Sequence, residues 1–320
     1  MQINVLEPGL STTVQDQGRT GYYHLGIPQS GSADQLSAQI ANALVGNHRD
    51  SAVLECTYTG PTLVVDDYTE LAVTGAPVEV KVNGRTQPMW HRLHLRPDDE
   101  ISFGDLAEGI RFYLAFRGGI DVPEVLGSRS TYVLGRLGGI NGRRLESGDV
   151  IPIGAPQKDL PKLMYLAEKL RPTFSKEQEV RILRGLYDHY LTEEGWRNLV
   201  ESEWTLTPTA DRMGLRYEGP GVMWAEREPK FGAGSDPSNI VDAGYAVGSI
   251  QIPGGTQPIL LHRDAVSGGG YAMVGTVISS DMDVVARAAA GTKTRFVEVD
   301  MDTALALRKQ ARELVDMFHP

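Results

Sequence analysis

Hydrophobic and polar residues alternate over short stretches along most of this chain, a spacing typical of strands. In VEVKVNGRTQPMW, Val78, Val80 and Val82 alternate with polar residues, and Asn83-Gly84 is the preferred two-residue turn of a β-hairpin. Comparable short runs bounded by turn residues recur in both halves of the chain, for example INVLE, TELAVTG, IRFYLAF, VRILRG and YAMVGTVIS. The pattern predicts a mainly β fold with a few helices.

Two longer stretches have helical spacing instead. In ADQLSAQIANALVGN, apolar residues recur every four positions between residues 36 and 44. Ser32 and Gln35 fit a capping box at the start of this helix, and Gly46 is placed to end it. The last stretch, residues 300–320, is predicted to be an amphipathic helix. Its expected apolar side consists of Leu305, Leu307, Ala311, Leu314 and Phe318.

A change of composition divides the chain into two β-rich halves. Residues 156–178 are rich in Lys, Pro and Glu, and we interpret them as a linker with one short helix. The halves on either side are residues 1–155 and 179–299, and the C-terminal helix follows at 300–320.

Composition and charge exclude several classes of protein. The formal net charge of −10 disfavours a nucleic-acid or anionic-membrane surface. The single cysteine, Cys56, lies in the apolar run AVLECTY; it excludes a disulfide framework and predicts a buried free thiol. MQINVLEPGL does not have the pattern of a signal peptide, and no apolar run approaches the roughly 20 residues that span a bilayer. We expect a soluble, cytoplasmic protein.

The stretch IPQSGSADQ contains three candidates that the capping box does not explain: Ser30, Gly31 and Asp34. A helix start with free N–H groups can bind an anion, although an ionised Asp34 would use part of that positive potential. The stretch does not match the G-x-S-x-G elbow of a serine hydrolase. Capping of a helix and lining of a pocket therefore both stay open.

A second candidate element is HRDAVSGGGYAMVG, in which Ser267 precedes three glycines. Amidase chemistry needs a second serine and a lysine in a suitable motif, which this half does not offer. Three glycines let a backbone approach a ligand closely and present successive N–H groups, which suits stabilisation of an oxyanion or enolate. A tight turn between two strands explains the same residues equally well.

Other residues narrow the chemistry further. Arg129, in GSRSTYVLGRLGG, can grip a carboxylate with its guanidinium. The seven histidines show no metal-binding spacing, and neither a P-loop nor a dinucleotide-binding fingerprint is present. We therefore expect no metal, ATP or NAD site.

Several motifs together carry a family resemblance. They are TVQDQGRTGYYHLGIPQSGSADQLSAQIANALVGN, LECTYTGPTL, AFRGGIDVPEVLGSRSTYVLGRLGG, LESGDVIPIG, DRMGLRYEGP, GSIQIPGGTQPILL and SGGGY. Over nearly its whole length the chain resembles the allophanate hydrolase subunit 2 family, also called the biotin-dependent carboxyltransferase, Kip-inhibitor-antagonist or 5-oxoprolinase C-subunit family. Members resemble the carboxyltransferase domain of urea carboxylase.

This resemblance implies two cyclophilin-like β-barrel halves and a partner chain, subunit 1. It also implies transfer of a carboxyl group from carboxybiotin to urea or another amide-like nitrogen. The chain has no A-M-K-M biotinylation motif, so biotin would be presented by a separate carrier that a biotin carboxylase serves. Alternatives are an allophanate or amide C–N hydrolase, a member of a 5-oxoprolinase complex, and a non-catalytic partner of a kinase-inhibitor-like subunit 1. The segment DPSNIVDAGYAVGSI is similar to that of urea carboxylases, which favours carboxyl transfer.

The resemblance also suggests roles for individual residues. The predicted catalytic residues are Ser267, Asp34 and Asp211. The predicted substrate- or biotin-binding residues are Arg19, Ser30, Gly31, Arg129, Arg212, Asn239, Gly268, Gly269, Gly270 and Tyr271. Among them the glycines are candidate donors to an enolate oxygen, the arginines candidate carboxyl ligands, and Asn239 a candidate contact of the acceptor.

Overall fold

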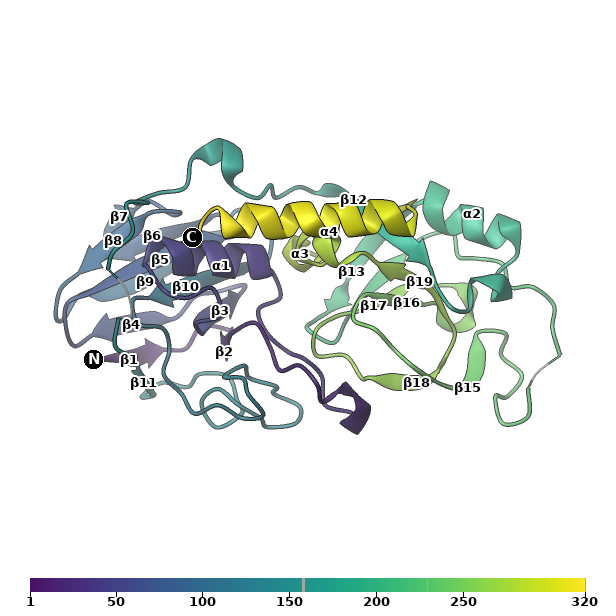
Figure 1. The fold of residues 1–320 in the computed structure, drawn as a ribbon, viewed down its shortest axis with the longest axis horizontal. Coiled ribbons are helices and arrows are strands. Elements are labelled where there is room, and N and C mark those ends of the chain that lie inside the picture. Colours follow the sequence, from purple (N-terminus) through teal and green to yellow (C-terminus); the bar gives the residue numbers. More distant parts are fainter. Residues whose placement is uncertain (157–158, 229, 320) are drawn as a thin grey trace. The chain divides into compact units, whose positions relative to one another are not determined.

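The structure is a computed structural model that describes the chain except for residues 157–158, 229 and 320 (Figure 1). The described residues form strands β1 to β20 and four α-helices, so the predicted mainly β fold with a few helices is confirmed. None of these helices is long and apolar enough to cross a membrane. Gln157 and Lys158 of the predicted linker and Pro320 of the predicted C-terminal helix lie outside the described residues.

Contacts divide the chain into two compact units. The first unit comprises residues 1–20, 30–174 and 314–320, and the second comprises residues 21–29 and 175–313. Residues 21–29, which include the 3₁₀ helix η1 (Tyr23–Leu25), therefore pack with the second unit although they precede most of the first.

The first unit contains two antiparallel sheets. The six-stranded sheet has the order β11 (Val150–Pro152), β1 (Gln2–Glu7), β4 (Thr62–Val65), β9 (Glu100–Leu106), β6 (Val78–Val82), β7 (Arg85–Gln87). The five-stranded sheet has the order β2 (Ser11–Gln15), β3 (Val53–Thr57), β10 (Arg111–Phe116), β5 (Thr69–Gly75), β8 (Arg92–Leu95). The predicted hairpin is present between β6 and β7, where Asn83 (φ 50°) and Gly84 (φ 74°) adopt the left-handed conformation that a type I′ turn needs. The linker contains the 3₁₀ helix η2 (Glu168–Leu170).

The central strands β3 and β10 are buried along almost their whole length, because side chains on both faces pack inside the unit. One face contributes Leu54 and Phe112 to the core of the unit, and the other contributes Tyr113 to a smaller cluster under helix α1. Cys56 is fully buried in β3 and free, as predicted, and burial raises the pKa of its thiol.

Helix α1 (Gln35–Leu44) has the predicted span but a different cap. The side chain of Asp34 accepts a hydrogen bond from the N–H of Ser37 at 3.1 Å and another from its hydroxyl at 2.6 Å. The predicted capping box of Ser32 and Gln35 is therefore wrong, because the helix begins two residues after the position it requires. Gly46 (φ 75°) follows the helix and donates to the carbonyl of Ala43, so the predicted stop is confirmed.

The second unit is a closed barrel. Its strands follow one another in the order β12 (Glu177–Arg184), β19 (Met273–Val277), β16 (Ser249–Gln251), β17 (Ile259–Leu261), β14 (Gly214–Glu218), β13 (Glu203–Ala210), β20 (Lys293–Glu298), with β20 returning to β12. Large side chains such as Trp204, Tyr217 and Phe296 fill its interior with no more than 2% exposure. A separate two-stranded ribbon consists of β15 (Asn239–Gly244) and β18 (Gly268–Tyr271). Three further 3₁₀ helices are η3 (Asp188–Tyr190), η4 (Pro253–Gly255) and η5 (Ser279–Asp281).

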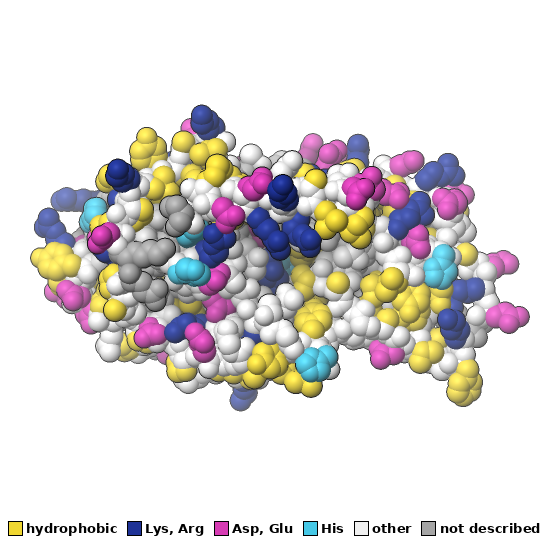
Figure 2. All heavy atoms as spheres, viewed as in Figure 1, with side chains coloured by type: hydrophobic (Ala, Val, Ile, Leu, Met, Phe, Trp, Pro, Cys, Tyr) yellow, Lys and Arg dark blue, Asp and Glu magenta, His cyan; other side chains and the backbone are white. Residues whose placement is uncertain are grey.

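Three α-helices follow β12 along the chain. Helices α2 (Glu193–Glu201) and α3 (Met282–Arg287) bury apolar side chains such as Leu199 and Val285 in the barrel core. Helix α4 (Met301–Asp316) is mostly exposed, and Leu305 of its predicted apolar side is 42% exposed. The buried residues of α4 are Ala304 and Val315, which are eleven positions apart and therefore share a stripe that excludes Leu305. On the face drawn in Figure 2, acidic, basic and hydrophobic side chains are intermixed.

Candidate functional site

The glycine-rich element of the second unit is a strand. Ser267 directly precedes β18, and Gly268, Gly269 and Gly270 are extended residues of this strand rather than a loop or tight turn. Strand β18 pairs with β15 in antiparallel register, with Tyr271 opposite Asn239. Side chains opposite each other in such a pair lie on one face with Cβ atoms about 5 Å apart. The structure thus brings six predicted residues onto one ribbon.

One edge of β18 is available for hydrogen bonding. The N–H of Tyr245 donates to the carbonyl of Ser267 at 2.8 Å, which marks Tyr245 and Ser267 as a hydrogen-bonded pair. Pairs alternate along an antiparallel ladder, so Gly268, opposite Gly244, directs its N–H away from β15. The register shifts between Asn239 and Ala243, and past this irregularity the N–H of Ala272 donates to the Ser238 carbonyl at 2.8 Å, so the outward direction is assigned to Gly268 alone. The ribbon has no third strand among the described residues.

The side chain of Tyr245 packs against the glycines of the ribbon and forms hydrogen bonds with Tyr271. Its hydroxyl accepts from the N–H of Tyr271 at 2.7 Å and donates to the carbonyl of the same residue at 2.9 Å. A Cβ at Gly269 would lie only 3.1 Å from the Tyr245 ring, whereas one at Gly270 would meet the Ile240 carbonyl oxygen at an ordinary 3.4 Å. Burial is the main cause that raises the pKa of Tyr245. Tyr271 itself is 41% exposed, so its ring faces solvent.

A cavity of about 770 Å³ lies in the connection that leads to β15. It is lined by Trp224, Ala225, Glu226, Arg227, Glu228, Ser235, Asp236 and Pro237. Its volume is within the range of small-molecule sites. The sequence analysis quoted Asp236 and Pro237 at the start of DPSNIVDAGYAVGSI but assigned no role to any of the lining residues.

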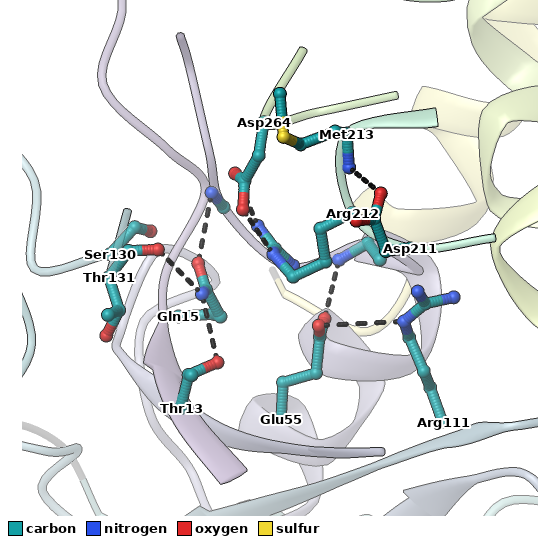
Figure 3. A network of polar contacts seen from close by, with 12 residues as sticks. Thr13, Gln15, Glu55, Arg111, Ser130, Thr131, Asp211, Arg212, Met213 and Asp264 are labelled. Atoms are coloured by element: carbon teal, nitrogen blue, oxygen red, sulfur yellow. Dashed lines mark hydrogen bonds and ion pairs between the residues drawn. The ribbon is translucent and has the colours of Figure 1, made fainter. Parts of the chain in front are cut away.

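Asp211 and Arg212 lie in a turn between β13 and β14 rather than on the ribbon. The Asp211 carboxylate accepts from the N–H groups of Met213 at 2.7 Å and Gly214 at 3.1 Å. The Arg212 guanidinium forms a two-pronged ion pair with Asp264, with N···O distances of 2.8 and 3.0 Å (Figure 3). Asp211 shapes the turn, and Arg212 is neutralised by a carboxylate of its own unit.

In the first unit, the segment that contains Ser30, Gly31 and Asp34 is tied down through its main chain. The N–H of Gly31 donates to Gln15 Oε1 at 3.1 Å, and that of Ser32 donates to the Asp16 carbonyl at 2.8 Å. Figure 3 shows the Gln15 carboxamide, whose Nε2 also donates to Thr13 and to the carbonyl of Thr131. The conformation is unusual, since Ser30 has a φ of 55° and Gly31 a φ of 88°. A Cβ at Gly31 would lie 2.8 Å from the Gln17 backbone, so glycine is required there.

The next two N–H groups of this segment reach a buried polar network. Ala33 donates to Glu55 Oε2 at 2.7 Å, and Asp34 donates to the Tyr113 hydroxyl at 2.8 Å. Tyr113 lies opposite Glu55 in the β3–β10 pair and donates to its carboxylate at 2.9 Å. Arg111 Nε lies 3.8 Å from Glu55 Oε1 (Figure 3). Every N–H from residue 31 to residue 34 therefore has a partner within the unit, and the N–H of Ser37 in the first turn of α1 donates to Asp34.

Sequence reasoning missed Glu55 and Tyr113, although a signal was present. Glu55 is an acidic residue in the apolar run AVLECTY, and a charge in a buried strand needs a partner. Burial is the main cause that raises the pKa of Tyr113 well above its ordinary value, and the carboxylates of Glu55 and Asp34 raise it further. Tyr113 therefore stays protonated and able to donate to Glu55.

Arg19 and Arg129 both contact the segment around Ser130. Arg19 is buried and its Nη2 donates to the Ser130 carbonyl. Arg129 pairs with Glu124 at 2.6 Å and Asp121 at 3.2 Å, and its main-chain N–H donates to the Asp16 carboxylate. Arg19 therefore holds the backbone at Ser130, and the backbone of Arg129 is held by Asp16, all within the first unit.

Taken by unit, the predicted residues form three groups. Asn239 and residues 267–271 share the ribbon, and Asp211 and Arg212 share a turn at a different place in the second unit. The third group belongs to the first unit and consists of Arg19, Ser30, Gly31, Asp34 and Arg129. Among the described residues no group of three or more His, Cys, Asp or Glu side chains could hold a metal ion.

The chain is a mainly β protein of two units: the first contains two antiparallel sheets, and the second contains a closed barrel and the β15–β18 ribbon. A family model for the carboxyltransferase domain, subdomain A and B, matches residues 25–298, and the chain belongs to this family. The resemblance predicted from the motifs is therefore confirmed.

Named relatives agree with this assignment. The urea amidolyase of Lachancea kluyveri is 33% identical over 317 residues, which cover 95% of this chain and 17% of that protein. The C subunit of 5-oxoprolinase from Escherichia coli (strain K12) is 31% identical over 317 residues, which cover 99% of this chain and 97% of that protein. The crystal structure of the Kluyveromyces lactis urea carboxylase matches with a TM-score of 0.93 and 34% identity, over 99% of this chain and 29% of that one. The chain thus spans less than a third of the urea amidolyase and of the urea carboxylase.

Proposed function

We propose that this chain is the carboxyltransferase component of a multi-protein system and moves a carboxyl group from carboxybiotin to urea or another amide-like nitrogen. The observation that carries this proposal is the match to the urea carboxylase fold over 99% of the chain, with a TM-score of 0.93. We further propose that it works with three components outside the matched region, which covers 29% of that protein. These are subunit 1, a biotin carboxylase and a carrier protein that presents biotin.

The ribbon residues fit the requirements of biotin. When bound, carboxybiotin supplies an activated carboxyl group on a ureido ring, whose oxygen gains electron density as the carboxyl group departs. The outward N–H of Gly268 is a suitable donor to that oxygen, because glycine keeps the edge clear of side chains. Ser267 adds a hydroxyl next to Gly268, and the exposed ring of Tyr271 offers an apolar surface.

The opposite strand of the ribbon contributes Asn239, a candidate contact of the acceptor. The carboxamide of Asn239 can accept from and donate to an amide-like nitrogen and its carbonyl. The first-unit residues and Asp211 and Arg212 stay predictions for binding or proton transfer. The carboxylates of Asp34 and Asp211 and the guanidiniums of Arg129 and Arg212 already have partners that shape the protein, whereas the buried hydroxyl of Ser30 has none among the described residues. The ribbon is therefore the part of the chain that we assign to contact with the ligand.

Reconstitution tests the proposal directly. The chain is co-purified with subunit 1 and supplied with biotin carboxylase, biotinylated carrier, ATP and ¹⁴C-bicarbonate. We expect ¹⁴C label in a carboxylated product, separated at alkaline pH because such N-carboxylates lose CO2 in acid, only when urea or another amide is present. Ser267→Ala should lower turnover, and Tyr68→Phe on an exposed side chain of the first unit serves as the matched control. Transfer that needs neither carrier nor biotin would refute the proposal.

The sequence similarity to the C subunit of 5-oxoprolinase favours a second candidate function. The two sequences are 31% identical over 317 residues, and this similarity supports a role as the equivalent member of a 5-oxoprolinase complex. The same preparation distinguishes the two functions. ATP-dependent conversion of 5-oxoproline to glutamate without biotin carboxylase and carrier would identify the second one.

A further inference from the structure

Asn239, the first residue of β15, is held at both of its main-chain polar groups. Its N–H donates to the carbonyl of Asp236 at 3.0 Å. Its carbonyl accepts from Arg227 Nη2 at 2.6 Å, and the same nitrogen donates to the Pro237 carbonyl at 2.8 Å. The backbone at Asn239 is therefore fixed by a cation that belongs to a different segment of the second unit.

Arg227 is itself held in one orientation. Its guanidinium carbon lies 3.9 Å from the centroid of the Tyr190 ring, and Tyr190 is only 6% exposed. A planar guanidinium that stacks on an aromatic ring cannot rotate without losing both the ring and the two carbonyls. A lysine would keep the charge but not the plane, so it can replace Arg227 only in part.

The side chain of Asn239, in contrast, is free for a ligand. Its carboxamide forms no hydrogen bond with any residue in the described part of the chain, and it is only half-buried. A Cβ at Gly234 would lie 3.6 Å from Asn239 Nδ2, so the glycine leaves room beside the amide. A carboxamide presents an acceptor and a donor on one edge, which complements the adjacent C=O and N–H of a ureido, primary amide or lactam group.

We infer that Arg227 is a positioning residue: it fixes Asn239 so that the carboxamide meets a ureido-type edge, with C=O and N–H side by side. This inference rests on the proposed function and names the chemistry that its ligand must have. Two molecules can supply that edge: the acceptor, such as urea or 5-oxoproline, and the ureido ring of biotin. The kinetic test separates these two sources.

The test compares Arg227→Met, Arg227→Lys and the control Arg216→Met in the reconstituted complex. Methionine keeps an apolar stem on Tyr190 and removes the donors to the two carbonyls. Arg216 is a part-buried arginine of the same unit whose side chain donates to the side chain of Gln257 at 3.2 Å. We expect Arg227→Met to raise one KM about tenfold, the equivalent of one well-placed hydrogen bond, with kcat nearly unchanged. Arg227→Lys should lie between it and wild type.

The KM that changes identifies the source of the edge. An increase in the KM for urea or 5-oxoproline assigns Asn239 to the acceptor, and an increase in the KM for the biotinylated carrier assigns it to biotin. Both KM values within twofold of wild type for Arg227→Met, as for Arg216→Met, would overturn the inference.

Direct binding keeps the inference testable if the wild-type complex transfers no carboxyl group. Binding of urea, 5-oxoproline and free biotin to the full chain is followed by ligand-observed NMR for wild type, Arg227→Met, Arg227→Lys and Asn239→Leu. Weaker binding of one probe to the Asn239 and Arg227 variants supports the inference although the proposed function has failed. No binding to wild type, or equal binding to all variants, overturns it. If circular dichroism shows that Arg227→Met is unfolded, Arg227→Lys and Asn239→Leu decide the outcome.

Discussion

The hydroxyl of Tyr113 joins two buried groups, so Tyr113→Phe tests how much this polar network stabilises the first unit. The hydroxyl donates to Glu55 at 2.9 Å and accepts from the N–H of Asp34 at 2.8 Å. Glu55 and Tyr113 are fully buried, and Asp34 is 1% exposed. Phenylalanine fills the same space but leaves one N–H without a partner and takes one donor from a carboxylate.

The expected loss follows from these two contacts. An unpaired buried N–H costs about 1–3 kcal/mol, and a hydrogen bond to a charged group is worth about 1.5–3 kcal/mol. We expect Tyr113→Phe to lower the free energy of unfolding by about 3 kcal/mol, after allowing for the more apolar side chain. In a unit of this size that corresponds to a fall in Tm of about 6–12 °C.

Calorimetry and urea unfolding measure this loss, with Tyr68→Phe as the control. Tyr68 is 72% exposed, so its variant should stay within about 0.5 kcal/mol of wild type. Equal stabilities of Tyr113→Phe and Tyr68→Phe would refute the reasoning, because the network would then not bear on stability.

The pH dependence gives a second readout of the same substitution. The pKa of Tyr113 is raised in the folded protein, mainly by burial, from an ordinary value near 10. The folded state therefore binds the proton more tightly than the unfolded state, and the stabilisation is fully present below pH 10 and is lost as pH rises above it. The stability difference between wild type and Tyr113→Phe should shrink above pH 10.

Three further predictions concern stability. Asp34→Ala should lower the free energy of unfolding by about 1 kcal/mol or more, because the cap of α1 is lost. Ser32→Ala should change it by less than about 0.5 kcal/mol, because the Ser32 hydroxyl has no partner among the described residues. Urea titration measures both variants. The side-chain hydrogen bond from Arg143 lowers the pKa of Asp149. The stability difference between wild type and Asp149→Asn should therefore be present above about pH 4 and vanish as pH falls through the lowered pKa. Thermal unfolding at a series of pH values measures this difference. Gly270→Ala should leave Tm unchanged, because the new Cβ would meet its neighbour at 3.4 Å, and a large fall in Tm would show that the strand is packed more tightly.

Local patterns predicted the elements better than the contacts between them. Alternation and the Asn83-Gly84 turn indicated β6 and β7, and four-residue spacing indicated α1. The cap was misplaced because Ser32 and Asp34 are both good capping residues. The hydrogen bond from the Ser32 N–H to the Asp16 carbonyl, which joins the segment to the end of β2, decides between them, and no local pattern reveals that contact.

The candidate site shows the same limit. Ser267 to Tyr271 were identified as a glycine element, but its pairing with Asn239 depends on a register that no local signal specifies. Glycines in a row favour turns by propensity, and tertiary pairing with β15 overrode this preference. Arg227 could not be singled out, because an arginine in a polar loop shows its role only when Tyr190 and the Asn239 carbonyl lie beside it.

The buried thiol of Cys56 gives this chain an internal reporter. It is the single cysteine of the sequence, it lies in a central strand of the first unit, and its raised pKa keeps it in the unreactive thiol form. A thiol-reactive dye should therefore label the chain only while that unit is open. Because the second unit has no cysteine, the labelling rate counts opening events of the first unit alone, and a partner chain that stabilises this unit would slow the dye without any engineered label.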